Sequence, residues 1–413
     1  MKNFLQYGAG NIGRGFIGQL FSQAGYEVSF IDINMEIIDA LNREGRYPVT
    51  IVSKQPPVDV WVENVKGIYG MDQAAVIDAI AGADIMATAI GVNILTRIVP
   101  LVANGIKKRK SIGNDAPLNI IICENLLDAD KMLRRLLLEH FDDEGQVYFE
   151  ENIGLVEASI GRMVPVMTEE QKKGDPLKVF VESYCELPVD KDAFKGEIPD
   201  IPHMFPYSPF ELYIKRKLYI HNLGHALTAY LGNLAGCEYT WQAMDNPYIK
   251  LIVLRSMQES AMSLAAMFNV STRELLDHIA DLQLRFANIA LGDTVMRVGK
   301  DTRRKLSAQD RFAGAIKTCE SQGIIPVYSS IGIAAALFFQ CPDDPGTDFV
   351  QGIFLKGGIE SVLSDICDIK PPSPSYNLII SYYDLLKENK DFSVLLSLAE
   401  ENHEKILKDK KVI

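Results

Sequence analysis

Residues 3–32 decide the fold of the first half of the chain, and they read NFLQYGAGNIGRGFIGQLFSQAGYEVSFID. Residues 3–7 predict a short buried strand, and a glycine-rich run follows at 8–15. Residues 16–24 have helical spacing and stop before a glycine, and residues 26–32 predict a second strand. The order strand, glycine turn, helix, strand is a βαβ unit, which predicts a parallel sheet.

The glycine run contains the GxGxxG pattern of a dinucleotide-binding turn, placed between a predicted strand and a predicted helix. Free N–H groups at the helix start can bind a pyrophosphate, and glycines allow its close approach. Asp32 follows Gly13 by 19 residues, where a carboxylate can accept hydrogen bonds from ribose hydroxyls. Because Asp32 would repel a 2′-phosphate, NAD is favoured over NADP. We expect the cofactor to contact Gly8, Ala9, Gly10, Asn11, Ile12 and Gly13.

Two further apolar segments, residues 84–91 and 119–125, predict strands of the same sheet. The carboxyl ends of the strands line the ligand crevice in open α/β sheets. We therefore expect Ile90 and Gly91 to contact the cofactor, and Asn125 to meet the substrate or the nicotinamide.

Three other segments complete the expected first domain. Residues 48–65 predict a β-rich excursion, and residues 126–141 predict one helix. The basic run at 107–110 is interpreted as the solvated end of a helix.

The pattern changes after residue 198, where several prolines punctuate a connecting segment and the rest of the chain becomes helical in spacing. We place the boundary between residues 1–205 and 206–413. The predicted fold class is α/β, with an N-terminal Rossmann-type doubly wound sheet domain that carries extra strands. A mostly α-helical C-terminal domain follows it.

Lys217, Asn222 and His225 lie in an apolar segment with helical spacing. At about 100° per residue they fall within one arc of roughly 140°. Oxidation of an alcohol needs a base for the hydroxyl proton and donors for the oxygen, and these three side chains suffice without a metal. Surface or hydrogen-bonded core residues are the alternative interpretation.

A second basic constellation opposes the acidic balance of the chain. It comprises five cations around a glycine turn, a composition that can hold a phosphate or a carboxylate through charge-assisted hydrogen bonds. The alternative is a solvated loop. The candidate phosphate ligands are Arg297, Lys300, Arg303, Arg304 and Lys305.

Composition excludes several classes of partner. Lys plus Arg is 42 against 54 for Asp plus Glu, and the net charge of −12 disfavours nucleic acid and anionic membranes. The six cysteines form no CxxC pair, so neither a metal site nor a disulfide framework is predicted. Without a leader or a long apolar run, the chain is expected to be cytoplasmic.

These motifs together resemble the polyol-specific long-chain dehydrogenase family, most closely its branch acting on mannitol 1-phosphate. The resemblance covers nearly the whole chain. It is carried by residues 8–18 (GAGNIGRGFIG), 123–125 (CEN), 197–202 (EIPDIP), the Lys217, Asn222 and His225 pattern, 224–232 (GHALTAYLG), 297–299 (RVG) and 304–306 (RKL).

The resemblance implies a metal-independent, NAD-linked enzyme that interconverts mannitol 1-phosphate and fructose 6-phosphate. Lys217 would be the acid/base, Asn222 with Asn125 would polarise the oxygen, and His225 would orient the substrate. A monomer is weakly favoured. A hexuronate reductase, a free-hexitol dehydrogenase and a catalytically lapsed NAD-binding protein remain as alternatives.

Three positions depart from the family pattern. Gly161 stands where an acid is usual, and His221 stands where an apolar residue is usual. Ile289 replaces the proline that normally follows Asn288. These departures leave the reaction class in place but put the exact substrate in doubt.

Overall fold

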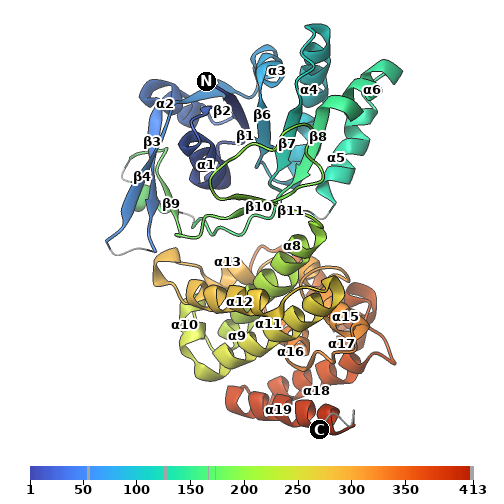
Figure 1. The fold of residues 1–413 in the computed structure, drawn as a ribbon. Coiled ribbons are helices and arrows are strands. Elements are labelled where there is room, and N and C mark those ends of the chain that lie inside the picture. The colour runs from blue at the N-terminus through green and yellow to red at the C-terminus, as the bar shows by residue number, and fades with distance from the viewer. Residues whose placement is uncertain (54–55, 125, 127, 166, 173, 410–413) are drawn as a thin grey trace. The chain divides into compact units, whose positions relative to one another are not determined.

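The structure, a computed structural model, describes residues 1–53, 56–124, 126, 128–165, 167–172 and 174–409. The chain divides into two compact units, Met1–Tyr213 and Ile214–Ile413 (Figure 1). The sequence analysis placed the boundary after residue 205, whereas this division falls within the helix α8 (Glu211–Arg216).

Unit 1 is built on a six-stranded sheet in which every pairing is parallel, with the order β5-β2-β1-β6-β7-β8. The order reverses between β1 and β6, so the ligand crevice of a doubly wound sheet lies at their carboxyl ends. The predicted fold class is confirmed. The strands are β1 (Asn3–Tyr7), β2 (Glu27–Asp32), β5 (Val65–Tyr69), β6 (Ile85–Thr88), β7 (Leu118–Ile122) and β8 (Ile153–Glu157).

Helices cover both faces of this sheet and create two hydrophobic cores (Figure 1). Phe4 belongs to one core and Leu5 to the other, because successive side chains of a strand point to opposite faces. The strands are therefore apolar on both sides, as expected for a buried parallel sheet. The helices are α1 (Gly18–Gln23), α2 (Met35–Glu44), α3 (Gln73–Gly82), α4 (Val92–Ser111), α5 (Ala129–Leu138) and α6 (Asp143–Asn152).

The helix expected over residues 126–141 corresponds to α5 (Ala129–Leu138), which is shorter at both ends. A second helix, α6, follows it and was not predicted. The Asp142 side chain accepts a hydrogen bond from Gly145 N at 2.8 Å and so caps α6. The acidic residues at 142–144 are a sequence signal for a helix start and could have located α6.

Arg109 corrects the interpretation of residues 107–110 as a solvated helix end. Its side chain is buried at the end of α4 and donates to three backbone carbonyls, those of Ala81, Ala83 and Ala116, at 2.8–2.9 Å. Ala81 and Ala83 precede α4 in the sequence, and Ala116 follows it. The guanidinium therefore ties α3 to the loop before β7.

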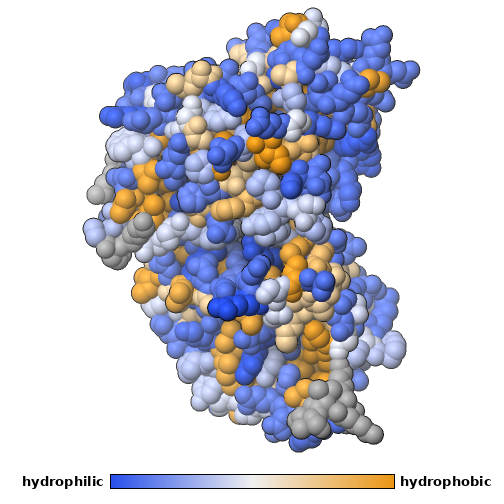
Figure 2. All heavy atoms as spheres, in the orientation of Figure 1, coloured by the Kyte–Doolittle hydropathy of each residue, from blue (hydrophilic) through white to orange (hydrophobic). Residues whose placement is uncertain are grey.

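Two small sheets extend unit 1, and the first of them occupies the region expected to be β-rich. Figure 2 shows hydrophobic residues on the surface of this small sheet. Val58 and Trp61 of this sheet are exposed. These sheets are β4-β3-β9, with β3 (Arg46–Ile51), β4 (Val58–Glu63) and β9 (Val179–Val181), and β10 (Leu187–Asp190) paired with β11 (Met204–Tyr207); the helices of this region are α7 (Glu169–Lys172) and α8 (Glu211–Arg216).

The described part of unit 2 forms no strand beyond one bridge between Tyr239 and Thr294. Its core surrounds α9, where Leu227, Tyr230 and Leu231 are fully buried. The helices are η2 (Lys217–Asn222), α9 (Leu223–Leu234), α10 (Thr240–Asp245), α11 (Pro247–Phe268), α12 (Thr272–Phe286), η3 (Ile289–Leu291), α13 (Val295–Gly299), α14 (Thr302–Leu306), α15 (Ala313–Ser321), α16 (Val327–Ala336), α17 (Pro345–Val362), η4 (Leu363–Cys367), α18 (Pro374–Glu388) and α19 (Phe392–Asp409).

In the part of the chain that the structure describes, no helix combines the length and the apolar character needed to cross a bilayer.

Candidate active site

The glycine turn follows β1 directly. The physical reason for a glycine differs from one position of the turn to the next. Gly8 has φ +100°, and a Cβ atom there would lie 2.5 Å from Ala89 O. A Cβ atom on Gly13 would lie 2.0 Å from Gly8 O, so the turn closes only without side chains at both positions. A Cβ atom on Gly10 would meet nothing within 4 Å. The second glycine therefore faces open space, where a ligand can approach the backbone.

Arg14 braces this turn from inside the protein. Its guanidinium donates to Ala9 O and, at 3.3 Å, to Pro176 O, and the side chain is buried. Burial lowers the pKa of Arg14, with Tyr47 and Asp32 opposing that effect. A helix of π type, η1 (Gly13–Ile17), carries the arginine. No role for Arg14 was predicted from the sequence.

Asp32 stands at the carboxyl end of β2, where the fingerprint predicts it. Its Oδ2 atom accepts a hydrogen bond from Ala9 N at 2.8 Å, and its Oδ1 atom accepts one from Asn34 N at 3.0 Å. The carboxylate thus links the glycine turn to the end of β2, and its remaining lone pairs can accept further hydrogen bonds.

Exposed apolar side chains gather next to Asp32. Ile33 and Met71 are 71% and 66% exposed, and Tyr69 is the strand partner of Asp32. A Cβ atom on Gly70 would lie 3.4 Å from Ile33 Cγ2, so the ends of β2 and β5 are adjacent. The sequence analysis missed this apolar surface, because the pairing of β2 with β5 was not known.

Ile90 and Gly91 form the loop between β6 and α4. Their backbone N–H groups donate to the two carboxylate oxygens of Glu124, at 3.0 and 2.8 Å. Glu124 is buried and follows β7, so the carboxyl ends of neighbouring strands are joined. The predicted residue Asn125 lies outside the described residues.

Lys217 and Asn222 are the first and last residues of η2, which is a π-helix rather than the α-helical turn expected from the sequence. In a π-helix the hydrogen bonds run between residues five apart, so these two side chains occupy similar positions on successive turns. His225 follows within α9, three residues after Asn222, which makes these two neighbours on the helix surface. The three side chains of Lys217, Asn222 and His225 therefore span a narrower arc than α-helical spacing predicts.

His225 is held between an aromatic ring and a carboxylate. Its ring stacks on Phe286, with centroids 4.9 Å apart and planes 6° apart. Its Nε2 atom lies 3.1 Å from Asp293 Oδ2, although the contact lacks hydrogen-bond geometry. Burial, with nearby cations headed by Arg297 and Arg311, lowers the pKa of His225 to about 3. The imidazole is therefore neutral at physiological pH.

His221, one of the departures from the family pattern, is also a buried neutral imidazole. Its ring centroid lies 6.2 Å from that of His225 and 5.7 Å from that of Phe286. Burial is the main cause that lowers its pKa, and Arg285 adds to the effect. The extra histidine thus packs beside His225 and Phe286.

Asp293 is a functional candidate that the sequence analysis missed. Its buried carboxylate pairs with Arg297 through Oδ1 and contacts His225 through Oδ2. It therefore connects the predicted acid/base segment to the predicted phosphate segment. Asp293 lies 68 positions after His225 in sequence, and no local motif marks it.

Two of the five predicted phosphate ligands already pair with carboxylates. Arg297 pairs with Asp293, and Arg304 pairs with Asp301 at 2.5 Å and Asp310 at 3.4 Å. The segment is therefore a partly neutralised cluster rather than an open basic loop.

The other three ligands differ in exposure. Arg303 lies over the Phe349 ring, with its Cζ atom 3.8 Å from the centroid, and Lys300 is exposed. Lys305 is buried and donates to Lys300 O. Burial, with Arg311 and Arg304 as the next causes, lowers the pKa of Lys305 to about 7.

Arg311 connects this cluster to Asn222. Its Nη1 atom is 3.5 Å from Asn222 O, and its Nε atom donates to Asp310 Oδ1 at 2.8 Å. Arg311 and Lys305 both lie near enough to His225 to lower its pKa. Within unit 2, Arg311 contacts Asn222, and Arg297, Arg311 and Lys305 all lie near His225.

Residues 2–203 match the mannitol dehydrogenase Rossmann domain, and residues 210–353 match the mannitol dehydrogenase C-terminal domain. The chain belongs to the mannitol dehydrogenase family. The recognition of a polyol dehydrogenase family is thereby confirmed, whereas the branch specific for a phosphorylated substrate is not.

Two solved structures share the fold along almost the whole chain. One is a mannitol 2-dehydrogenase from Pseudomonas fluorescens in a ternary complex with NAD and D-mannitol, 16% identical, with a TM-score of 0.74 over 97% of this chain and 94% of that one. The other is a substrate-free D-sorbitol dehydrogenase, 15% identical, with a TM-score of 0.76 over 94% of each chain. At such identities the likeness concerns the fold.

Gly161 stands where the sequence resemblance leads us to expect an acidic residue, and an aromatic ring covers it. A Cβ atom at 161 would lie 3.2 Å from Tyr184 Cε1, so an acidic side chain would need Tyr184 to move. The next residue, Arg162, is buried and donates to Gly15 O at 3.0 Å and to Gln19 Oε1 at 2.8 Å. This segment therefore supports the helix that follows the glycine turn.

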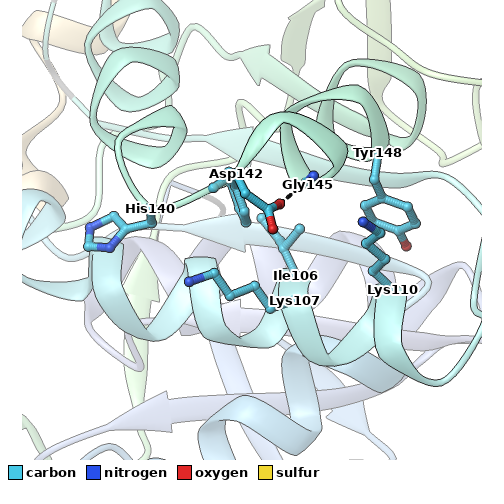
Figure 3. A pocket seen from close by; sticks show the side chains of 8 residues that line it. Ile106, Lys107, Lys110, His140, Asp142, Gly145 and Tyr148 are labelled. Atoms are coloured by element: carbon cyan, nitrogen blue, oxygen red, sulfur yellow. Dashed lines mark hydrogen bonds between the residues drawn. The ribbon is translucent and has the colours of Figure 1, made fainter.

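Unit 1 also contains a pocket of about 400 Å³ where α4 ends and α6 begins (Figure 3). Lys107, Lys110, His140 and Tyr148 contribute to its lining, and Lys110 pairs with Glu144 at 3.2 Å. Because α4 begins after β6 and ends before β7, this pocket lies at the amino edge of the sheet, away from the glycine turn.

Among the described residues, no three His, Cys, Asp or Glu side chains form a group that could hold a metal ion.

Proposed function

We propose that the chain is an NAD-dependent, metal-independent dehydrogenase that interconverts a hexitol phosphate and a ketose phosphate, with mannitol 1-phosphate and fructose 6-phosphate as the pair. The observation that carries this proposal is the grouping of Asn222 and His225 with the cations Arg297, Arg311 and Lys305 in a domain of the mannitol dehydrogenase family.

Unit 1 would hold NAD along the carboxyl edge of its sheet. The open backbone at Gly10 suits the pyrophosphate, and Asp32 suits the ribose hydroxyls of the adenosine half. The exposed apolar side chains of Ile33 and Met71 offer a surface for the adenine ring. Ile90 and Gly91 follow β6, in the half of the fold that takes the nicotinamide. The family's Rossmann domain and the NAD held by the mannitol 2-dehydrogenase structure support this assignment.

NAD, when bound, supplies the hydride acceptor. Lys217 in its amine form would take the hydroxyl proton of the carbinol as the C–H bond transfers its hydride, and would return that proton in the reduction direction. Asn222 would donate a hydrogen bond to the oxygen, on which negative charge develops. A neutral His225 neither repels the nearby cations nor competes as a base, so its role would be to orient a substrate hydroxyl.

An anionic substrate is supported by the charges around His225. Four cations lie close enough to depress the pKa of this imidazole, and Arg297, Arg311 and Lys305 are three of them. Charge-assisted hydrogen bonds from such a group suit a phosphate, and arginine pairs with phosphate in bidentate fashion.

A free hexitol is the second candidate, and the carboxylate partners of Arg297 and Arg304 favour it. Cations that are already paired have less attraction for a phosphate. The two solved relatives are named for mannitol and sorbitol, which carry no phosphate. A hexuronate would present a carboxylate to the same cations.

The test is NADH formation from mannitol 1-phosphate, mannitol and mannonate, each at matched concentrations. The proposal requires the highest kcat/KM for mannitol 1-phosphate. A preference for mannitol or mannonate would replace the phosphate assignment. NAD binding without turnover on all three would instead support a lapsed enzyme, which the departures at Gly161 and His221 motivate.

A further inference from the structure

Glu124 joins two strand ends in unit 1 through a paired contact. Both of its carboxylate oxygens accept backbone N–H groups, from Ile90 at 3.0 Å and from Gly91 at 2.8 Å. The residue is 8% exposed. Both oxygens therefore act as hydrogen-bond acceptors for the same loop.

The loop that Glu124 holds leads directly into α4. Gly91 has φ +86°, and it precedes α4 as a cap residue without a side-chain acceptor. The Glu124 carboxylate thus takes the place of a capping side chain and adds negative charge beside the N-terminus of a 20-residue helix.

The position of this loop in the sheet defines which ligand group it faces. A doubly wound sheet consists of two mononucleotide-binding halves, and Asp32 on β2 marks the adenosine half. Glu124 follows β7, which pairs with β6 and β8 in the other half. It therefore stands on the nicotinamide side of the reversal point, and its charge is shielded from solvent.

We infer that Glu124 is a positioning residue that fixes the loop at 90–91 for the nicotinamide half of the cofactor, and that its charge favours the oxidised form. The oxidised ring carries a positive charge and the reduced ring carries none, so a buried carboxylate on this side stabilises NAD⁺ relative to NADH. This inference rests on the proposed function, because it requires a nicotinamide cofactor.

The chain contains a matched control for the structural part of this role. Glu259 is buried in unit 2 and accepts the consecutive backbone N–H groups of Tyr328 at 3.0 Å and Ser329 at 2.9 Å, one on each oxygen. It makes the same paired contact at the start of α16, among residues to which no cofactor role is assigned.

The experiment measures the affinities of the full-length chain for NAD⁺, NADH and ADP-ribose by isothermal titration calorimetry. Glu124→Gln should weaken NAD⁺ binding about tenfold more than NADH binding, as expected for removal of one partly buried charge. ADP-ribose, which lacks the nicotinamide, should bind within about twofold of the unsubstituted chain because the adenosine half is untouched. Glu259→Gln should leave all three affinities unchanged.

Glu124→Asp separates the charge from the loop contact. The shorter side chain keeps the charge but withdraws from Ile90 and Gly91, so NAD⁺ and NADH should weaken together and their ratio should stay. Equal weakening of both cofactors in Glu124→Gln, or loss of ADP-ribose binding to the same degree, would overturn the inference. If the unsubstituted chain bound neither NAD⁺ nor NADH, the proposed function itself would fail.

Discussion

Asp293 Oδ2 lies 3.1 Å from His225 Nε2, while Oδ1 of the same carboxylate pairs with Arg297. One buried acid therefore contacts both an imidazole of the predicted acid/base segment and a cation of the predicted phosphate segment. With Nε2 facing a carboxylate, the neutral imidazole is favoured in the form that carries its proton on Nε2. Nδ1 is then left as an acceptor for a substrate hydroxyl.

Asp293→Asn should lower kcat by about 10- to 100-fold, because misplaced orienting groups cost rates of that order. The amide keeps the shape but removes the charge that faces His225 and Arg297. The measurement is steady-state kcat together with the Kd for NADH, which should not change. Asp301→Asn is the control, since Asp301 also pairs with an arginine, Arg304, and contacts no site histidine. Equal losses in both variants would show that Asp293 has no special role.

Lys217→Ala should lower kcat by at least about 100-fold, since a positioned general base accelerates a reaction by that order. NADH affinity should persist, because the glycine turn is in unit 1. The measurement pairs initial rates with NADH fluorescence titration. Near-normal activity of the variant would remove Lys217 from the mechanism.

The KM for mannitol 1-phosphate should rise as the pH increases through about 7. Burial lowers the pKa of Lys305 to about 7, so its positive charge is present below that pH and is lost above it. The KM for mannitol, which carries no phosphate, should lack this step. In Lys305→Met the step should disappear for mannitol 1-phosphate, and the KM for mannitol should stay independent of pH in this range. A step of equal size with mannitol would exclude Lys305 as a phosphate ligand.

Asp32→Ala should shift cofactor preference toward NADP by at least about tenfold in kcat/KM, because the carboxylate that repels a 2′-phosphate is removed. The rate is compared with NAD and NADP at saturating polyol. Asn34→Ala is the control: it removes the side chain that caps α2 and leaves the carboxylate in place. Its cofactor preference should match that of the unsubstituted chain, and an equal shift in both variants would contradict the prediction.

Glu259 should make the chain less stable as the pH rises. Burial raises the pKa of Glu259 from 4.5 to about 7, so the folded state retains a proton that the unfolded state has lost. The contribution is complete below about pH 4.5 and falls by about 3 kcal/mol as the pH rises to about 7. Thermal unfolding of the unsubstituted chain and of Glu259→Gln at pH 5 and pH 8 checks this.

The variant should lose the part of that difference which Glu259 contributes. A residual dependence is expected, because burial also raises the pKa of Glu157 in unit 1 to about 7. An unchanged difference in Glu259→Gln would show that Glu259 titrates outside this range.

Some parts of the fold were predictable because their causes are local. The turn at residues 8–15 needs backbone conformations and close approaches that only glycine allows, and these needs are visible in the sequence. Strands such as β1 and β7 are mostly apolar, apart from the buried Gln6 and Asn119, because both faces of their sheet are covered. The start of α6 had a local signal in Asp142 that was missed.

Other features had no local cause. Arg109 is in a run of four basic residues, and only the carbonyls of Ala81, Ala83 and Ala116 make it a buried residue. The five cations of residues 297–305 look equivalent in sequence, yet Lys305 is buried and Arg304 is paired with acids. A buried charge needs partners, and these partners come from segments that only folding brings together.

The sequence by itself determined the glycine turn with Asp32, the parallel α/β order of the first unit and the helical character of the second. It did so because backbone sterics and the alternation of apolar residues act over a few positions. Tertiary structure decided the π-turn from Lys217 to Asn222, the Asp293 contact with His225 and the grip of Glu124 on residues 90–91. The contacts of Asp293 and Glu124 join atoms that are distant along the chain, and the π-turn departs from the α-helical spacing that the sequence predicts.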